Sequence, residues 1–243
     1  MTKRSVPDFA EYAPKGFLYR NIDPTELAAR LGSVNTFNRS GDVIFQDGFE
    51  SGLAAFYDIA PGTDADTDIT PLTSRNGGFS CKMVSGLLAE SVTLVAKFLA
   101  YPFLCKMGFE VSFSYPSTGV QIYIALLIYT GDERVLGLIL IEPASERIRY
   151  YTVDSTWVVL VSGVDPALGT QWFNTIKLVI DFENRMFDKL FINKDVVDIN
   201  SYALHVSDSD AAPLLDTEVY IKPTTNVNRT VYIDDWIMTI NEP

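Results

Sequence analysis

The chain has a single histidine among its 243 residues, and this scarcity removes many common catalytic designs. Zinc sites built from histidine, and nucleophiles activated by a histidine base, lose their usual parts. His205 has no nucleophilic side chain next to it in the sequence, so we interpret it as a core or edge residue. A Gly-x-Ser-x-Gly elbow and a phosphate-binding glycine loop are also missing. We therefore predict that the protein is not an enzyme.

Positive charge is scarce as well, because 19 lysines and arginines face 31 aspartates and glutamates, a net charge of −12. Such a chain repels phosphate backbones, so nucleic-acid binding is not expected. The charge is uneven: residues 1–41 hold six basic and four acidic side chains and carry +2, which leaves −14 for the rest. A mildly basic arm on an acidic body could dock onto a neighbouring copy.

Long apolar runs are absent. Hydrophobic residues nevertheless make up 47% of the chain, and this apolar surplus favours a contact between subunits of an oligomer. The longest run, Val120–Tyr129, has the length of a sandwich strand and falls short of the roughly 20 residues of a membrane-spanning helix. Residues 1–17 carry charges and prolines where a secretory signal needs an apolar run. We expect no membrane association and no signal peptide, with cytoplasmic synthesis.

Cysteine is limited to Cys81 and Cys105, which lie in similar strand-like segments. If their strands paired, a disulfide closing this loop could contribute about 3 kcal/mol. Without an export signal, two buried free thiols are the favoured interpretation.

Period-two alternation of polar residues with β-branched and aromatic ones runs through the chain from residue 42 onward. Residues 109–115 alternate in this way, whereas Val120–Tyr129 is apolar on both faces, as in a central strand covered on both sides. Further strands are predicted at 135–141, 147–153, 156–161, 172–182, 189–192, 218–221 and 230–240. The pattern predicts an all-β fold, a two-sheet antiparallel β-sandwich (jelly roll) over residues 42–243. Residues 60–78 and 206–215 are expected to be irregular loops.

Residues 1–41 form an N-terminal arm of different character, with one short α-helix predicted over residues 24–31. Asp23 suits the N-cap, Pro24 the first helical position, and Gly32 the left-handed turn that ends a helix. A helix of about two turns is marginal alone, so it must pack on the body or on a partner subunit. The side chains expected to mediate assembly are Phe17, Tyr19, Arg20, Leu27 and Leu31.

Three parts of the sequence resemble the jelly-roll modules of concanavalin A-like lectins and carbohydrate-binding modules. They are Asp47 with Phe-Glu-Ser-Gly at 49–52, the segments 172–181 and 190–194, and Val-Tyr-Ile-Asp-Asp-Trp at 231–236. The resemblance covers residues 43–241. It implies a structural calcium ion on Glu50 and Asp235, with Asp47 or Asp234 assisting. Calcium takes about six to eight oxygen ligands. The alternative is a solvated pair of acids at strand ends.

The arm lies outside that resemblance. An arm preceding a jelly roll in an acidic chain looks like phage virion accessory proteins, such as capsid decoration or tail proteins, which leave the cell by lysis. This second resemblance implies a homo-oligomer or other virion proteins as partners, and a place on the virion surface after lysis.

Glycan binding in lectin-like modules uses exposed aromatic side chains that stack on sugar rings, which makes Tyr150, Tyr151, Trp157, Trp172 and Trp236 candidates. Tyr150 and Tyr151 point to opposite faces of a strand, so at least one of them is expected to reach solvent. Trp236 lies in the last strand and Trp157 precedes an apolar run, which favours the core for both. We retain Tyr150, Tyr151 and Trp157 as ligand-binding candidates.

We therefore predict a non-enzymatic structural or assembly protein with a lectin-like jelly roll, of the phage virion accessory type. The alternative is a carbohydrate-binding module with a structural calcium ion. A glucanase-like hydrolase is the third interpretation. It ranks last because the acidic segments 142–146 and 181–183 do not reproduce the Glu-x-Asp-x-Glu run of jelly-roll glucanases. The alternating acids at 64–68 are interpreted as a solvated loop, since Ile69 stands where an EF-hand has glycine.

Overall fold

The computed structural model describes residues 41–243, apart from residues 90, 101–102, 165, 167 and 194. The predicted arm helix and the assembly candidates Phe17, Tyr19, Arg20, Leu27 and Leu31 lie outside the described residues.

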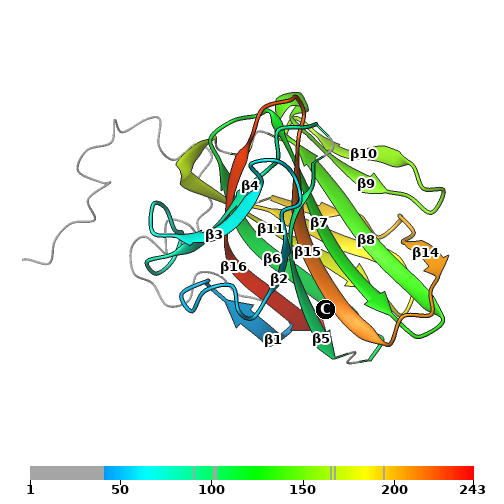
Figure 1. Ribbon diagram of the computed structural model, residues 1–243. Coiled ribbons are helices and arrows are strands. Elements are labelled where there is room, and N and C mark those ends of the chain that lie inside the picture. The colour runs from blue at the N-terminus through cyan, green and yellow to red at the C-terminus, as the bar shows by residue number, and fades with distance from the viewer. Residues whose placement is uncertain (1–40, 90, 101–102, 165, 167, 194) are drawn as a thin grey trace, which may run out of the picture.

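The described residues form two antiparallel sheets packed face to face, which confirms the predicted β-sandwich (Figure 1). The strands of sheet A are β1 (Asp42–Asp47), β3 (Asp66–Thr70), β4 (Ser80–Val84), β6 (Lys106–Tyr115), β11 (Gly169–Asp181), β12 (Met186–Ile192), β13 (Asp195–Asp198) and β16 (Thr230–Ile240). Their order is β13-β12-β11-β6-β16-β4-β3, and β1 also pairs with β16. First and last strands of the sandwich therefore lie side by side.

Sheet B supplies the second layer. Its strands are β2 (Tyr57–Ile59), β5 (Thr93–Ala100), β7 (Val120–Tyr129), β8 (Glu133–Glu142), β9 (Arg147–Tyr151), β10 (Trp157–Ser162), β14 (His205–Asp208) and β15 (Leu214–Pro223). Their order is β10-β9-β8-β7-β15-β5-β2, and β14 also pairs with β8. A short 3-10 helix, η1 (Pro143–Ser145), joins β8 to β9.

The hydrophobic core lies between the sheets and takes alternate residues from each strand. Trp236 of β16 is fully buried there and packs against Phe109 and Phe56. Its indole N–H donates a hydrogen bond to the Thr217 hydroxyl of β15, in the opposite sheet. This polar contact satisfies the one hydrogen-bonding group that a buried tryptophan brings into a core.

Two strands occur where loops were predicted. β3 lies within residues 60–78. Its two aspartates point to solvent while Thr67 and Ile69 are partly buried, so the acidic composition of the segment did not indicate a strand. β14 pairs with β8 at Val135 and Leu136, a stretch of the β8 edge that β9 does not cover. It thereby satisfies backbone groups that β9 leaves open. By contrast, β7 and β16 have the predicted bounds.

Among the described residues, no helix is long and apolar enough to cross a membrane. Cys81 and Cys105 are free thiols rather than a disulfide. Cys81 is buried in β4, whereas Cys105, just before β6, is only partly buried.

Candidate functional site

The outer face of sheet B, which points away from sheet A, carries a second set of packed apolar side chains. It arises because β7 is apolar on both faces: Ile122 and Ile124 enter the core, whereas Tyr123 and Ala125 point outward. The outward residues of β7 and β8, each at most 7% exposed, are Tyr123, Ala125, Leu127, Leu136, Leu138 and Leu140. The partly buried aromatic residues packed against them are Tyr129, Tyr151, Trp157 and Tyr220. The apolar strip is therefore bordered by aromatic side chains that are partly exposed to solvent.

Five rings from β14, β9, β10, β7 and β15 make a continuous aromatic cluster on this face. Tyr123 stacks on Tyr220 with ring centroids 4.3 Å apart and planes 10° apart. Trp157 contacts Tyr123 at 5.8 Å and Tyr151 at 5.2 Å. The ring of His205 meets Tyr151 edge-on at 5.1 Å. Strand register sets this order, because Tyr123 is paired with Tyr220 and Tyr151 with Trp157.

Positive charge lies along one edge of the aromatic cluster. The Lys222 ammonium is 5.6 Å from the centre of the Tyr123 ring, and the Arg149 guanidinium is 5.9 Å from that of Trp157. Arg149 also donates a hydrogen bond to the backbone carbonyl of Trp157 at 2.9 Å. Such contacts hold the rings and the cations in fixed positions relative to each other.

A carboxyl pair, Asp216 and Glu218, lies on the same outer face of β15. The residues that alternate with them, Leu215, Thr217 and Val219, point into the core. Pairing with β7 and β5 places Asp216 between Leu127 and Phe98, and Glu218 between Ala125 and Ala96. The acids therefore stand in an apolar setting beside Tyr220.

Burial perturbs both acids of the carboxyl pair. Asp216 is only 3% exposed, and Glu218 lies two residues further along the same face of β15. Desolvation, then the charge of Glu218, raise the pKa of Asp216 to about 8, while the Arg134 guanidinium acts in the opposite direction. Desolvation also raises the pKa of Glu218, against the hydrogen bond from Asp216 and the charge of Arg134. Near neutral pH Asp216 therefore holds a proton.

Two of the three predicted ligand-binding residues belong to the aromatic cluster. Tyr151 and Trp157 are both partly exposed on the outer face of sheet B. Tyr150 points the other way, is 8% exposed, and packs against Phe187 and Tyr202 in the core. The two tyrosines divide between the faces as the period of a strand requires.

Sequence reasoning missed the carboxyl pair and the two stacked tyrosines. The predicted strand covered only residues 218–221, so Asp216 was not recognised as part of a strand. The signal was available, because Asp216, Glu218, Tyr220 and Lys222 alternate with Leu215, Thr217, Val219 and Ile221. Because β7 is apolar on both faces, its sequence did not indicate which of its residues point outward.

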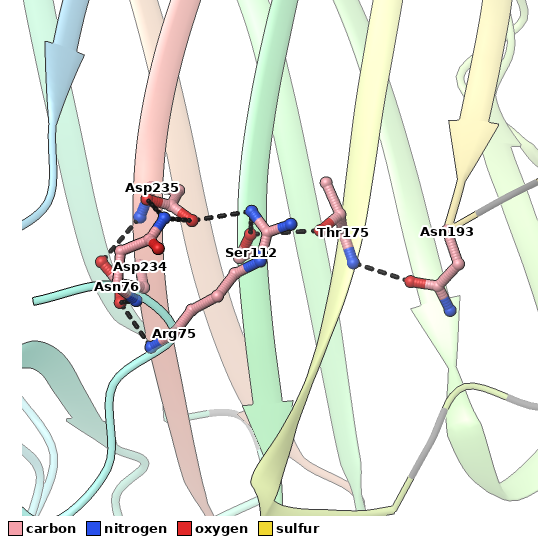
Figure 2. Close-up of polar contacts among 7 residues, drawn as sticks. All are labelled: Arg75, Asn76, Ser112, Thr175, Asn193, Asp234 and Asp235. Atoms are coloured by element: carbon pink, nitrogen blue, oxygen red, sulfur yellow. Dashed lines mark hydrogen bonds and ion pairs between the residues drawn. The ribbon is translucent and has the colours of Figure 1, made fainter. Parts of the chain in front are cut away.

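The predicted calcium ligands lie around the loop between β3 and β4. Asp234 accepts hydrogen bonds from the backbone N–H groups of Arg75 and Asn76, at 2.7 and 3.2 Å (Figure 2). Asp235 pairs with the Arg75 guanidinium at 2.7 Å and accepts a hydrogen bond from the Asn76 side chain. Arg75 also donates to Ser112 of β6 at 3.0 Å. The two aspartates therefore clamp the loop onto β16.

The other two predicted ligands hold backbone in the same region. Glu50 accepts hydrogen bonds from the N–H groups of Gly78 and Phe79, at 2.8 and 2.9 Å, and Asp47 accepts one from Phe49. Gly77 has φ +66°, and a Cβ atom there would collide with the Glu50 carboxylate. The turn thus needs glycine both for its backbone and for space.

The arrangement of these four acids fits a loop clamp better than a calcium site. Their oxygens face N–H donors and a guanidinium, whereas calcium requires about six to eight oxygens turned toward one point. Among the described residues, no group of three or more histidine, cysteine, aspartate and glutamate side chains is arranged to hold a metal ion. Calcium binding by Asp47, Glu50, Asp234 and Asp235 stays a prediction.

No protein-family model and no curated protein matches the sequence. Solved structures do match: a cellulose-induced protein, Cip1, has a TM-score of 0.54 at 13% identity, over 80% of this chain and 96% of that one. An endo-β-1,4-glucuronan lyase from the fungus Trichoderma reesei has a TM-score of 0.57 at 11% identity, over 82% and 96%. A protein of unknown function with a galectin-like fold from Bacillus subtilis has a TM-score of 0.52 at 10% identity, over 84% and 98%.

At these identities the likeness shows the fold alone. The chain is a jelly-roll β-sandwich, and its structural neighbours include a protein with a galectin-like fold and a glucuronan lyase. None of the three neighbours above is described as a virion protein.

Proposed function

We propose that the protein is a carbohydrate-binding β-sandwich whose glycan lies on the outer face of sheet B. The aromatic cluster carries this proposal: Tyr151, Trp157 and Tyr220 are partly exposed over a floor of buried aliphatic residues, and Tyr123 links Trp157 to Tyr220. Adjoining aromatic side chains that reach solvent on one face mark a binding surface rather than random exposure.

The chemistry of the face suits a sugar. Aromatic rings present flat apolar surfaces that can cover the C–H face of a pyranose, and stacked or edge-on packing fixes their orientation beforehand. Hydroxyl groups at the sugar's edge need polar partners, which Arg149, Lys222 and Glu218 provide at the border of the cluster. Rigid rings with a polar border lower the entropic cost of binding.

The structural neighbours support the same proposal. Cip1 is described as cellulose-induced, and the Trichoderma reesei protein as acting on β-1,4-glucuronan. The assembly hypothesis rests on the N-terminal arm, whose residues 1–40 lie outside the described part of the chain, and these neighbours add nothing to it.

We further propose binding without cleavage. Glycoside hydrolysis by two carboxyl groups needs them on either side of the scissile bond, roughly 5 to 9.5 Å apart. Asp216 and Glu218 are instead neighbours on one face of β15, and Asp216 is only 3% exposed, so they do not stand on opposite sides of an open cleft. The pair is better suited to act as one polar group.

Binding of soluble polysaccharides tests the proposal, with cello-oligosaccharides and polyglucuronate as the first probes. Tyr151→Ala and Trp157→Ala should each weaken binding by about fivefold or more, since each loses an aromatic contact worth on the order of 1 kcal/mol or more. Phe103→Ala is the matched control, because Phe103 is 50% exposed but lies outside the aromatic cluster. Absence of binding across a broad glycan panel would refute the proposal, and release of reducing or unsaturated sugars would show an enzyme instead.

A further inference from the structure

The carboxyl pair of Asp216 and Glu218 lies on the same face of sheet B as the aromatic cluster. Asp216 is almost fully buried, and its Oδ1 atom has no hydrogen-bond donor among the described residues. An unpartnered buried oxygen is far less costly on a neutral carboxylic acid than on a carboxylate. The geometry therefore favours Asp216 as the protonated partner, donating its hydrogen bond to Glu218.

Few other charged groups face the carboxyl pair. From β7 the neighbours are Leu127, Ala125 and Tyr129, and from β5 they are Phe98 and Ala96. Burial raises the pKa of Tyr129 and of Tyr220, so both phenols stay neutral near neutral pH. The cation acting on the pair is Arg134 of β8, which lowers the pKa of both acids. His205 is on the same face, separated from Asp216 by Leu136 and Leu127.

These neighbours give a simple charge balance. With Asp216 protonated, the negative charge of Glu218 is offset by Arg134. Loss of the proton leaves two carboxylates in an apolar setting with a single positive charge nearby, and the repulsion between them disturbs the position of Glu218. Glu218 is the more exposed acid, and it lies two residues before Tyr220, the member of the aromatic cluster on β15.

We propose that Glu218, held in place by protonated Asp216, is the acceptor for hydroxyl groups of an uncharged glycan, and that binding weakens when Asp216 loses its proton. This inference rests on the proposed function. A sugar hydroxyl donates to the Glu218 carboxylate while its ring lies on Tyr220 and Tyr151. An anionic sugar would instead bring a second negative charge toward Glu218, so the site selects neutral sugars.

The test compares dissociation constants near pH 6 and near pH 9.5 for the best neutral oligosaccharide found in the panel. Wild-type affinity should fall by about tenfold or more at the higher pH, because Asp216 is then ionised. Asp216→Asn keeps a hydrogen-bond donor toward Glu218 and cannot ionise, so its affinity should be the same at both pH values. Glu218→Gln should bind weakly at both. Glu183→Gln, at an exposed acid in the turn between β11 and β12 of sheet A, is the control and should keep the wild-type pH dependence.

Proton uptake gives a second readout that needs no variant to fold. At a pH slightly above 8, sugar binding to the wild type should take up protons, measured by calorimetry in buffers of different ionisation enthalpy. Sugar binding with equal affinity at both pH values and no proton uptake would overturn this inference while leaving the proposed function intact. Binding of no sugar at any pH would overturn both. Persistence of the wild-type pH dependence in Asp216→Asn would assign the titration to another group and refute the role of the pair.

Discussion

Nη1 of Arg75 lies 2.7 Å from Oδ2 of Asp235, and this ion pair ties the loop between β3 and β4 to the last strand of the sandwich (Figure 2). Both side chains are shielded, with 0% and 7% of their surface exposed. Because Asp235 has a left-handed backbone, with φ 48°, the strand is irregular at the point where the loop docks. The bulge in pairing between Asp234 and Ile237 turns both aspartates toward the loop.

Replacing Arg75 with methionine should destabilise the protein strongly. The change leaves the Asp235 charge buried without its partner, which typically costs about 3 to 5 kcal/mol. Arg185→Ala is the control, since Arg185 pairs with Glu133 at 2.7 Å but is 53% exposed. Loss of such a surface pair should cost less than about 1 kcal/mol. Chemical denaturation measures both, and equal small effects would contradict a structural role for the buried pair.

Removal of divalent cations tests the predicted calcium site. We expect a chelator to leave the melting temperature of the wild type unchanged, because the Asp235 carboxylate is already neutralised by Arg75. A native-state ligand must stabilise by mass action, so a clear fall in melting temperature that calcium reverses would establish the site. Glu50→Gln should then abolish that response.

The two thiols should differ in reactivity. Burial raises the pKa of Cys81, and nearby Asp58 and Asp68 act in the same direction, so its thiolate is strongly disfavoured. Cys105 is only partly buried. A thiol reagent should therefore modify Cys105 in the folded protein and Cys81 only after unfolding. Mass spectrometry of labelled peptides identifies the site, and rapid native labelling of Cys81 would contradict its burial in β4.

The N-terminal arm gives a separate prediction about assembly. If Phe17, Tyr19, Leu27 and Leu31 mediate contacts between copies, light scattering behind a sizing column should show an oligomer for the full chain and a monomer for a chain starting at Asp42. Circular dichroism of the truncated chain is the control for folding. A compact monomer in both cases would remove the assembly hypothesis and leave glycan binding alone.

Period-two patterning predicted the sandwich because each core strand buries one row of side chains. β6 illustrates this success, since Phe109, Val111 and Phe113 all face the core. The acidic strand β3 was missed because its exposed aspartates outweigh the partly buried Thr67 and Ile69 in any composition-based judgement.

The site was harder to predict because it depends on register between strands far apart in sequence. Tyr123 and Tyr220 stack only because β7 pairs with β15 in one alignment, and a shift by one residue would turn either ring into the core. Trp157 and Tyr151 meet across a turn and were within reach of sequence reasoning. No local pattern brings His205 to Tyr151, because β14 reaches that position by pairing with the open edge of β8.

Asp216 should make folding stability depend on pH even without a ligand. Its pKa is raised from 3.8 to about 8 in the folded protein, so the unfolded chain loses the proton first as pH rises. Its stabilising effect is complete below about pH 4, declines as pH rises, and is lost above about pH 8, with a total change on the order of a few kcal/mol. Asp216→Asn removes this contribution, so the variant should gain stability relative to the wild type as pH rises from about 5 to about 9. Asp154→Asn, at an exposed acid between β9 and β10, is the control and should track the wild type. Denaturation midpoints across this range measure the difference, and parallel curves for wild type and Asp216→Asn would show that Asp216 is ionised in the folded protein throughout.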